Sequence, residues 1–471
     1  MITTTTPTAV PRSTRRWTAL GVLALAQFLV VLDASIVNIA LPVVGRELGL
    51  DTVALAWVIT AYVLPFGALL LLGGRLADRF GHRMLFLIGA VGFVSASALA
   101  GFSSNGGMLL VARALQGTSA AVLAPAALAL LTILFPEARD RARALGIWGG
   151  VAGIGSVAGV LLGGVLTATL GWQWVFFVNV PVGAVVLVFI PLLITRDTAA
   201  RASRLDVPGA VTITAALVSL VGGLSAIEQA GPLAPITLVL GVLAVAFTVA
   251  FVRIERRSAQ PLLPFAIFRN RNLASGNIVA LLVGGAMVAL FFALSVYLQS
   301  VLHYDALAAG LSQLPLAGAL VVVAGTVPAL VNRIGARATV VVSTAVLAAG
   351  LVWLALSPVG AGFAVQLLGP TLLIGVGIGG AMVSATQLAV DGVSAEESGL
   401  AGGLVNTSQQ IGGALGLAVL ASVAAAVTGS LSASGAAADT ALAGGFSALF
   451  VGAAALVVAA GVAAAASGRR S

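Results

Sequence analysis

The sequence contains no cysteine and only two histidines among its 471 residues. These absences exclude a disulfide framework and any metal centre built from thiolates or from clustered imidazoles. Lysine is absent as well, so all 23 basic residues are arginine. Without lysine there is no G-x-x-x-x-G-K-[ST] loop, which excludes ATP hydrolysis of the P-loop type. We therefore expect no cofactor, no metal and no enzymatic activity.

Charged residues are also scarce, at 8% of the chain, whereas 60% of the residues are hydrophobic. A water-soluble fold cannot bury so large an apolar fraction. An α-helix needs about 20 apolar residues to cross the hydrocarbon layer, and lipid offers the backbone no other hydrogen-bond partners. We therefore expect an all-α integral membrane protein with fourteen transmembrane helices, at residues 18–42, 54–73, 84–102, 108–134, 144–168, 174–194, 207–226, 235–253, 275–299, 307–331, 338–357, 362–388, 400–427 and 443–466.

The arginines predict the orientation of these helices. With the N-terminus in the cytoplasm, every arginine except Arg46 and Arg113 lies in a cytoplasmic segment, as the positive-inside rule requires. We therefore expect a multi-pass protein with both termini in the cytoplasm. A composition without lysine and rich in alanine and glycine is typical of the codon usage of GC-rich bacteria. We therefore expect the membrane to be a bacterial cytoplasmic membrane. The net charge of +8 is then a topology signal, and we expect no nucleic-acid partner.

A short motif occurs twice in the chain. Residues 78–83 read D-R-F-G-H-R after the second apolar run, and residues 332–337 read N-R-I-G-A-R after the tenth. Transporters are often built from structural repeats. The duplication predicts two six-helix bundles with two helices inserted between them. The expected division is a cytoplasmic tail (1–17), a first bundle (18–196), two inserted helices (197–256), a cytoplasmic linker (257–274), a second bundle (275–466) and a tail (467–471).

The stretch "GGRLADRFGHRM" (73–84) resembles the loop signature of the major facilitator superfamily. The segments "LDASIVNIALPVV", "RALQGTSAAVLAP", "GWQWVFFVNVPVG", "LDVPGA" and "YLQSVL" resemble those of its fourteen-helix drug:proton antiporters, the EmrB/QacA-like branch. This resemblance covers nearly the whole chain. It implies the major facilitator fold and efflux of small lipophilic, cationic drugs in exchange for protons. Drug, protons and the lipid bilayer are the implied partners, and we expect a monomer.

Asp33 and Arg113 are the candidates for proton coupling. An acid deep in a membrane helix is costly to insert and marks a function by default. The resemblance assigns to Asp33 the role of the family's helix-one acid, and it links Arg113 to proton coupling. Two alternatives stay open at this point. Asp33 could be a structural acid paired to Asn38, Gln27 or Ser35, and Arg113 could extend towards an interface.

Two sets of residues are candidates for conformational gating. The resemblance implies that the loop around Asp78 braces the cytoplasmic ends of the bundles when the protein opens outward. Glycines four residues apart on the fifth helix form a smooth stripe for close helix packing. Val160 stands where the family's antiporter motif usually has proline, which puts a bend there in doubt. The gating candidates are Gly73, Asp78, Arg79, Gly81 and Arg83 in the loop and Gly155, Gly159, Gly163 and Gly164 in the stripe.

Polar and aromatic side chains within the apolar runs are candidates for substrate binding, because a drug site is a largely apolar cavity with few directional contacts. They are Asn38, Trp57, Tyr62, Gln116, Tyr297, Gln299, Asn406 and Gln409. The same pattern fits a dedicated exporter of one endogenous metabolite or antibiotic, which only a substrate panel would separate from a multidrug exporter. A transporter-like receptor fits less well, because gating motifs in both repeats and a titratable acid favour transport.

Overall fold

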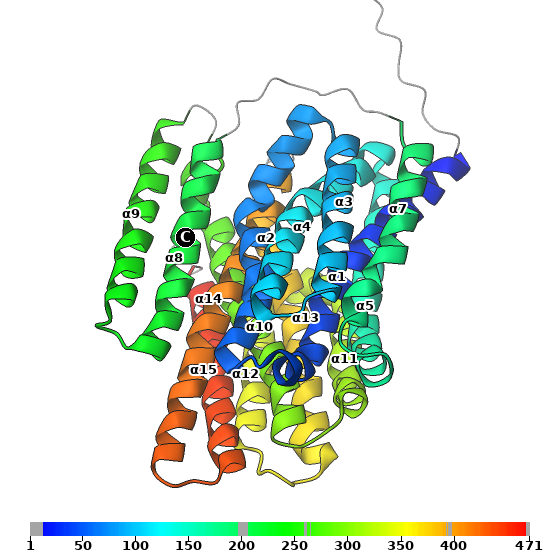
Figure 1. Cartoon of the computed structure of the whole chain (residues 1–471). Coiled ribbons are helices and arrows are strands. Elements are labelled where there is room, and N and C mark those ends of the chain that lie inside the picture. Colours follow the sequence, from blue (N-terminus) through cyan, green and yellow to red (C-terminus); the bar gives the residue numbers. More distant parts are fainter. Residues whose placement is uncertain are drawn as a thin grey trace, which may run out of the picture.

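The computed structural model describes residues 13–195, 206–258, 261–263, 265–391, 393 and 398–467. Within these residues, fourteen helices are long and apolar enough to cross a membrane, and each corresponds to one of the fourteen predicted runs. The protein is therefore an all-helical, multi-span integral membrane protein (Figure 1).

The first seven helical segments form six spans, because α6 and α7 together make one of them. Their bounds are α1 Ser13–Leu48, α2 Thr52–Phe80, α3 His82–Gly101, α4 Gly106–Leu134, α5 Ala138–Thr169, α6 Trp174–Phe177 and α7 Asn179–Leu193. The inserted pair is α8 Val207–Ala230 and α9 Pro235–Arg257. After a short 3-10 segment, η1 Phe265–Arg269, the last six spans are α10 Arg271–Ser300, α11 Ala306–Ile334, α12 Ala336–Leu356, α13 Gly369–Val390 with the preceding π-helical turn η2 Ala364–Leu368, α14 Ser398–Ala433 and α15 Ala438–Ala466.

The two groups of six spans pack by the same scheme. In the first group α1 packs against α5 and α7, and in the second α10 packs in the same way against α14 and α15. The α2–α4 and α3–α4 pairs correspond to the α11–α13 and α12–α13 pairs. The bundles meet through α2 with α14, α5 with α11 and α1 with α10. This shared scheme is the structural counterpart of the duplicated motif.

The duplicated motif forms two one-residue helix junctions. Gly81 alone separates α2 from α3, and Gly335 alone separates α11 from α12. Both glycines have positive φ, 98° and 85°, which side chains rarely tolerate. The N–H of each donates to the carbonyl four residues earlier, on Ala77 and Val331. The end of the molecule that carries these junctions is called the Gly81 end below.

The structure corrects the expected extent of the first loop. The sequence placed a turn from residue 73 onward, but α2 continues as a helix to Phe80. Gly73, Asp78 and Arg79 are therefore helical, and only Gly81 makes the turn. Helix α2 extends beyond the apolar run because the backbone hydrogen bonds continue, and Arg79 in the last turn suits the negative end of the helix dipole.

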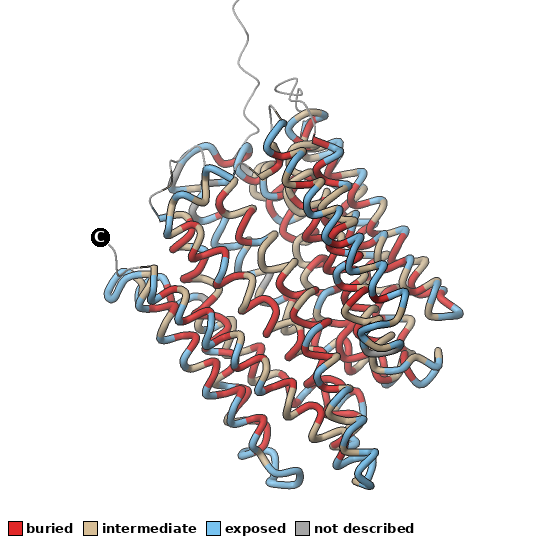
Figure 2. Tube along the Cα trace, turned by 90° about the vertical axis from the view of Figure 1, so that its left-hand side faces the viewer, coloured by how far each residue is buried: buried red, intermediate tan, exposed pale blue. Residues whose placement is uncertain are grey.

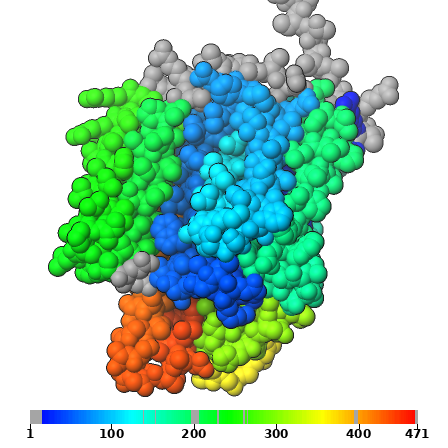
Figure 3. All heavy atoms as spheres, viewed as in Figure 1, coloured from blue at the N-terminus to red at the C-terminus, as the bar shows by residue number. Residues whose placement is uncertain are grey.

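The inserted pair lies on the flank of the molecule. Helix α8 packs against α9 and also contacts α2 and α14. Exposed apolar side chains run along α9 at Leu238, Val242, Val245 and Val249, and most of that helix faces outward. Figure 3 shows the pair as the left-hand flank beside the first bundle. Figure 2 shows buried and exposed positions alternating along the helices, as expected when their outer faces meet lipid.

Candidate functional site

A buried ion pair lies inside the first bundle. Arg113 Nη1 on α4 donates to Asp33 Oδ2 on α1 at 2.6 Å, and the two side chains are 1% and 0% exposed. The guanidinium also donates to Gln116 Oε1 at 2.9 Å and to the Val58 carbonyl at 3.2 Å. Arg113 therefore points into the bundle and does not extend towards an interface. A buried charge is tolerated only with such partners.

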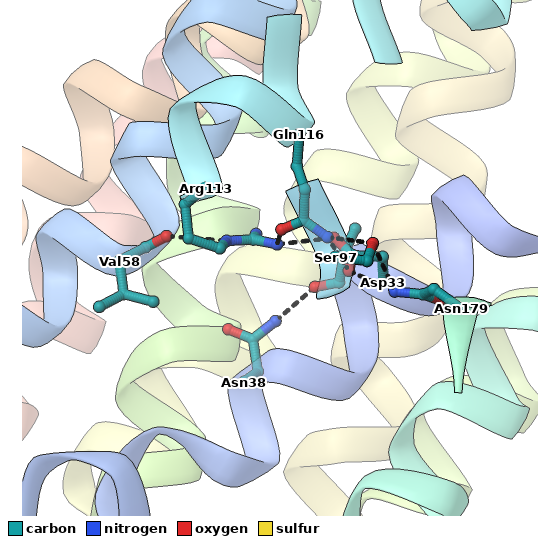
Figure 4. A network of polar contacts seen from close by, with 8 residues as sticks. Asp33, Asn38, Val58, Ser97, Arg113, Gln116 and Asn179 are labelled. Atoms are coloured by element: carbon teal, nitrogen blue, oxygen red, sulfur yellow. Dashed lines mark hydrogen bonds and ion pairs between the residues drawn. The ribbon is translucent and has the colours of Figure 1, made fainter. Parts of the chain in front are cut away.

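Neutral groups complete the shell around Asp33. Its Oδ1 accepts from Gln116 Nε2 at 3.0 Å and from Asn179 Nδ2 at 2.9 Å. Gln116 Nε2 also donates to Ser97 Oγ at 2.7 Å. Figure 4 shows these side chains converging from α1, α3, α4 and α7. The sequence-based alternative named other partners for Asp33, and they are not the residues that bind its carboxylate here.

Sequence reasoning missed two members of this network, Ser97 and Asn179. Asn179 had a signal, because it is a polar residue at the point where "GWQWVFFVNVPVG" enters an apolar helix. Ser97 had none, since a single serine in a membrane helix is common. The packing of the bundle decides which polar residues of the four helices come into contact.

A large cavity lies between the two bundles. Its volume is about 890 Å³, which suits a drug-sized molecule. Helices α1, α2, α4 and α5 line it from the first bundle, and α10, α11 and α14 line it from the second. The lining is mainly apolar, and its polar members away from the Gly81 end are Gln27, Ser35, Asn38, Tyr62, Trp148, Ser156, Gln313, Asn406, Gln409 and Gln410.

The cavity extends to the Gly81 end of the molecule. Gly74, Arg75, Asp78 and His82 line it there, together with Gly399, Leu400, Gly402 and Gly403 at the start of α14. At the other end the bundles are joined by hydrogen bonds from α10 to the backbone of α1. Ser295 Oγ donates to the Asn38 carbonyl, and Gln299 Nε2 donates to the Ile39 carbonyl at 2.9 Å. The cavity therefore reaches one end of the molecule, whereas hydrogen bonds between the bundles close the other end.

Tyr62 contacts both the ion pair and the cavity. The Arg113 guanidinium carbon lies 4.4 Å from the centroid of its ring, in the geometry of a cation–π contact. Tyr62 also lines the cavity, whereas Asp33 and Arg113 are not among its lining residues. The Tyr62 ring therefore lies between the ion pair and a molecule bound in the cavity, and a change in the charge of the pair can affect the bound molecule through this ring.

The predicted substrate residues separate into two groups. Four of them, Asn38, Tyr62, Asn406 and Gln409, line the cavity. The other four lie elsewhere. Gln116 belongs to the Asp33 network, and Gln299 joins the bundles at the closed end. Trp57 donates to Ser225 of α8 at 3.0 Å, and Tyr297 accepts from Gln366 at 2.8 Å.

The predicted gating glycines lie at close helix contacts. An added Cβ at Gly73 would lie 2.1 Å from the Ala121 carbonyl oxygen of α4. Gly155, Gly159 and Gly163 face α1, and an added Cβ at Gly159 would lie 2.6 Å from Cβ of Ser35. Gly164 instead faces α11, where an added Cβ would lie 2.7 Å from the Ala306 carbonyl oxygen. The stripe thus contacts both its own bundle and the opposite one.

Charged residues of the first motif contact neighbouring residues of the first bundle and the segment after the inserted helices. Asp78 pairs with His82 at 3.1 Å, and Arg83 donates to the Pro191 carbonyl at 3.2 Å. The Arg79 guanidinium lies 5.3 Å from the ring centroid of Phe80. Arg75 donates to the Pro261 carbonyl, in the segment that follows the inserted helices.

Comparisons with known proteins agree with this architecture. Residues 23–417 match the Major Facilitator Superfamily. The chain is 43% identical to the puromycin resistance protein pur8 of Streptomyces alboniger, covering 88% of this chain and 83% of that one. It is 40% identical to the cephamycin export protein CmcT of Amycolatopsis lactamdurans (86% and 84% covered), and 34% identical to the multidrug resistance protein Stp of Mycobacterium tuberculosis (85% and 74% covered).

Solved structures show the same fold at low identity. A bacterial homologue of the human lysosomal transporter Spinster, in an inward-facing and unoccupied conformation, matches with a TM-score of 0.69 at 16% identity, covering 97% of this chain and 98% of that one. A POT family transporter in complex with a thioalcohol-conjugated peptide matches with a TM-score of 0.70 at 13% identity, covering 94% and 95%. With its match over most of the sequence and its fourteen spans, this chain belongs to the major facilitator superfamily.

Proposed function

We propose that the protein is a proton-coupled exporter of small lipophilic drugs or antibiotics across the bacterial cytoplasmic membrane. It acts as a monomer with the Gly81 end and both termini in the cytoplasm. The relatives at 34–43% identity carry names of resistance and export proteins, which supports efflux. The observation that carries the proposal is the buried Asp33–Arg113 pair, joined to the drug-sized cavity through Tyr62.

Asp33 is the group that exchanges the proton. In the described state its charge is balanced by Arg113, and the cavity is open at the Gly81 end to take up a drug from the cytoplasm. When Asp33 binds a proton, Arg113 loses its anionic partner and keeps the Gln116 and Val58 oxygens as acceptors. The positive charge then acts through the Tyr62 ring on the cavity wall. The drug binds in the cavity and the proton binds to Asp33, so the two events are linked although they take place at different sites.

Rocking of the two bundles moves the drug. The two bundles are residues 18–196 and 275–466. They turn about contacts such as that of Gly164 of α5 with α11, where small residues allow the backbones to slide. The Asp78 motif closes the cytoplasmic end when the other end opens. One proton moving through about 150 mV releases about 3.5 kcal/mol, enough for roughly a 300-fold gradient of a neutral substrate.

Transport into everted vesicles tests the proposal. Everted vesicles that pump protons inward are incubated with an external drug panel that includes ethidium and chloramphenicol. The wild-type protein is expected to accumulate a substrate only while the proton gradient is present, and Asp33→Asn to abolish that accumulation. Asp439→Asn is the matched control, because Asp439 is exposed and is not among the residues that line the cavity. Full proton-driven transport by Asp33→Asn would refute the assignment of the proton to this residue.

A second candidate function is dedicated export of one antibiotic. It is favoured by the same comparisons, since two of the relatives are named for a single compound, puromycin or cephamycin. Transport of one member of a broad panel, with no competition from the others, would support it over multidrug export.

A further inference from the structure

Two polar atoms without partners lie in the wall of the same cavity, on opposite bundles. Among the described residues, neither the Tyr62 hydroxyl of α2 nor the Gln313 Oε1 of α11 has a hydrogen-bond partner. Both residues are 1% exposed and both line the cavity. Buried polar groups in proteins are almost always hydrogen-bonded, so an unpaired one requires an explanation. A ligand that enters the cavity is the explanation that accounts for both.

The two atoms are chemically complementary to one kind of ligand. A tyrosine hydroxyl can donate a hydrogen bond, and an amide oxygen accepts one. The amide nitrogen of Gln313 is already turned to its own helix, towards the Ala309 carbonyl at 3.4 Å, which leaves the oxygen for a partner. A molecule with one acceptor and one donor, such as a carbonyl and a hydroxyl or amide N–H, satisfies both.

The charge of the cavity argues against dependence on a cationic group. Among the described lining residues the one carboxylate is Asp78, which is exposed, lies at the Gly81 end and pairs with His82. The carboxylate of Asp33 is balanced by Arg113, and protonation of Asp33 would leave that region positive. A cation therefore meets no buried negative charge in the middle of the cavity in either state.

We infer that the cavity selects lipophilic, uncharged molecules that carry both a hydrogen-bond donor and an acceptor, held between the Tyr62 hydroxyl and the Gln313 amide oxygen. This narrows the substrate class of the proposed function and rests on it. It replaces the cationic preference implied by the family resemblance with recognition by neutral hydrogen bonds. Because the anchors belong to different bundles, rocking pulls them apart, so the substrate is held tightly in one state and released in the other.

Direct binding to the purified protein in nanodiscs tests the inference with two probes. Chloramphenicol is uncharged and carries hydroxyl and amide groups, whereas tetraphenylphosphonium is a permanent cation with no hydrogen-bonding group. We expect tighter binding of chloramphenicol to the wild-type protein. Tyr62→Phe and Gln313→Leu should each weaken it about 3- to 10-fold, as expected for one lost hydrogen bond, and leave tetraphenylphosphonium binding unchanged.

Two control variants separate recognition from folding. Tyr304→Phe removes a tyrosine hydroxyl, and Gln387→Leu removes a membrane glutamine that also has an unpaired oxygen, yet neither residue lines the cavity. Both should bind chloramphenicol within about twofold of wild type. Gln313→Glu places a carboxylate in the cavity and should tighten tetraphenylphosphonium binding at least 10-fold.

Three results would overturn the inference: tighter binding of tetraphenylphosphonium by the wild type, unchanged chloramphenicol binding in both anchor variants, or no chloramphenicol binding by the folded protein. Failure of the proposed function looks different. Anchor-dependent chloramphenicol binding without proton-driven transport would leave this inference standing and refute the antiporter. Proton-driven export of cations alone would support the antiporter and refute this inference.

Discussion

Breaking the Asp33–Arg113 pair one residue at a time should cost more than breaking it completely. Arg113→Gln leaves a buried carboxylate that keeps only the amides of Gln116 and Asn179 as donors, and Asp33→Asn leaves a buried guanidinium with only neutral acceptors. Removing one partner of a buried pair typically costs about 3–5 kcal/mol, whereas a neutral replacement of both is far milder. The double variant should therefore be about 2–3 kcal/mol more stable than the sum of the single effects predicts.

Reversible unfolding in mixed micelles, titrated with sodium dodecyl sulfate and followed by tryptophan fluorescence, measures the four free energies of unfolding. The pair His303–Asp439 supplies a matched control, because its atoms are 3.3 Å apart but its side chains are 68% and 66% exposed. Its coupling should stay below about 0.5 kcal/mol. If the Asp33 and Arg113 effects are as additive as those of the control, the two side chains do not form a buried pair and the coupling mechanism loses its physical basis.

Three further predictions concern the helices around the site. Gly73→Ala should abolish expression of folded protein, because its Cβ would lie 2.1 Å from a backbone oxygen, whereas Gly74→Ala, with its nearest atom at 3.8 Å, should be tolerated; size-exclusion profiles distinguish the two. Gly159→Val should fold less well and lose most transport in vesicles, since α1 lies against that position. The chain lacks cysteine, so single cysteines report topology: an impermeant maleimide should label Ser434→Cys in intact cells and Phe80→Cys only in everted vesicles. Labelling of both from one side would contradict the orientation.

The helices of this protein were predictable from the sequence because a single physical requirement fixes them. Hydrocarbon thickness sets the length of each apolar run, and all fourteen runs correspond to spans in the structure. The ends of the helices were less predictable. Helix α2 continues through the charged segment to Phe80, because polar residues at a membrane surface do not interrupt the backbone hydrogen bonds of a helix. Only Gly81, with its positive φ, ends it.

The site was predictable only where a residue was unusual for its position. A carboxylate and an arginine within membrane helices draw attention because their burial is costly, and the structure brings Asp33 and Arg113 into contact. Amides and hydroxyls are ordinary in such helices, and the sequence does not say which face the cavity. Of the predicted substrate residues, Tyr62 lines the cavity while Trp57 contacts the inserted helix α8. That distinction depends on how the helices are rotated, which hydrophobicity alone does not fix.

The two bundles share a scaffold but carry different chemistry. Their helix pairings correspond, and Gly81 and Gly335 make the same junction in each. In the first bundle the buried network is built on an ion pair, whereas the buried contact between Gln366 and Tyr297 in the second is neutral. If Asp33 exchanges the proton, as proposed, its protonation changes the charge of the first bundle. Under the proposed mechanism, a substrate held between the bundles would meet one wall whose charge follows the protonation of Asp33 and, among the described lining residues, a wall without a buried ion pair opposite it, so that binding and release would differ in the two halves of the cycle.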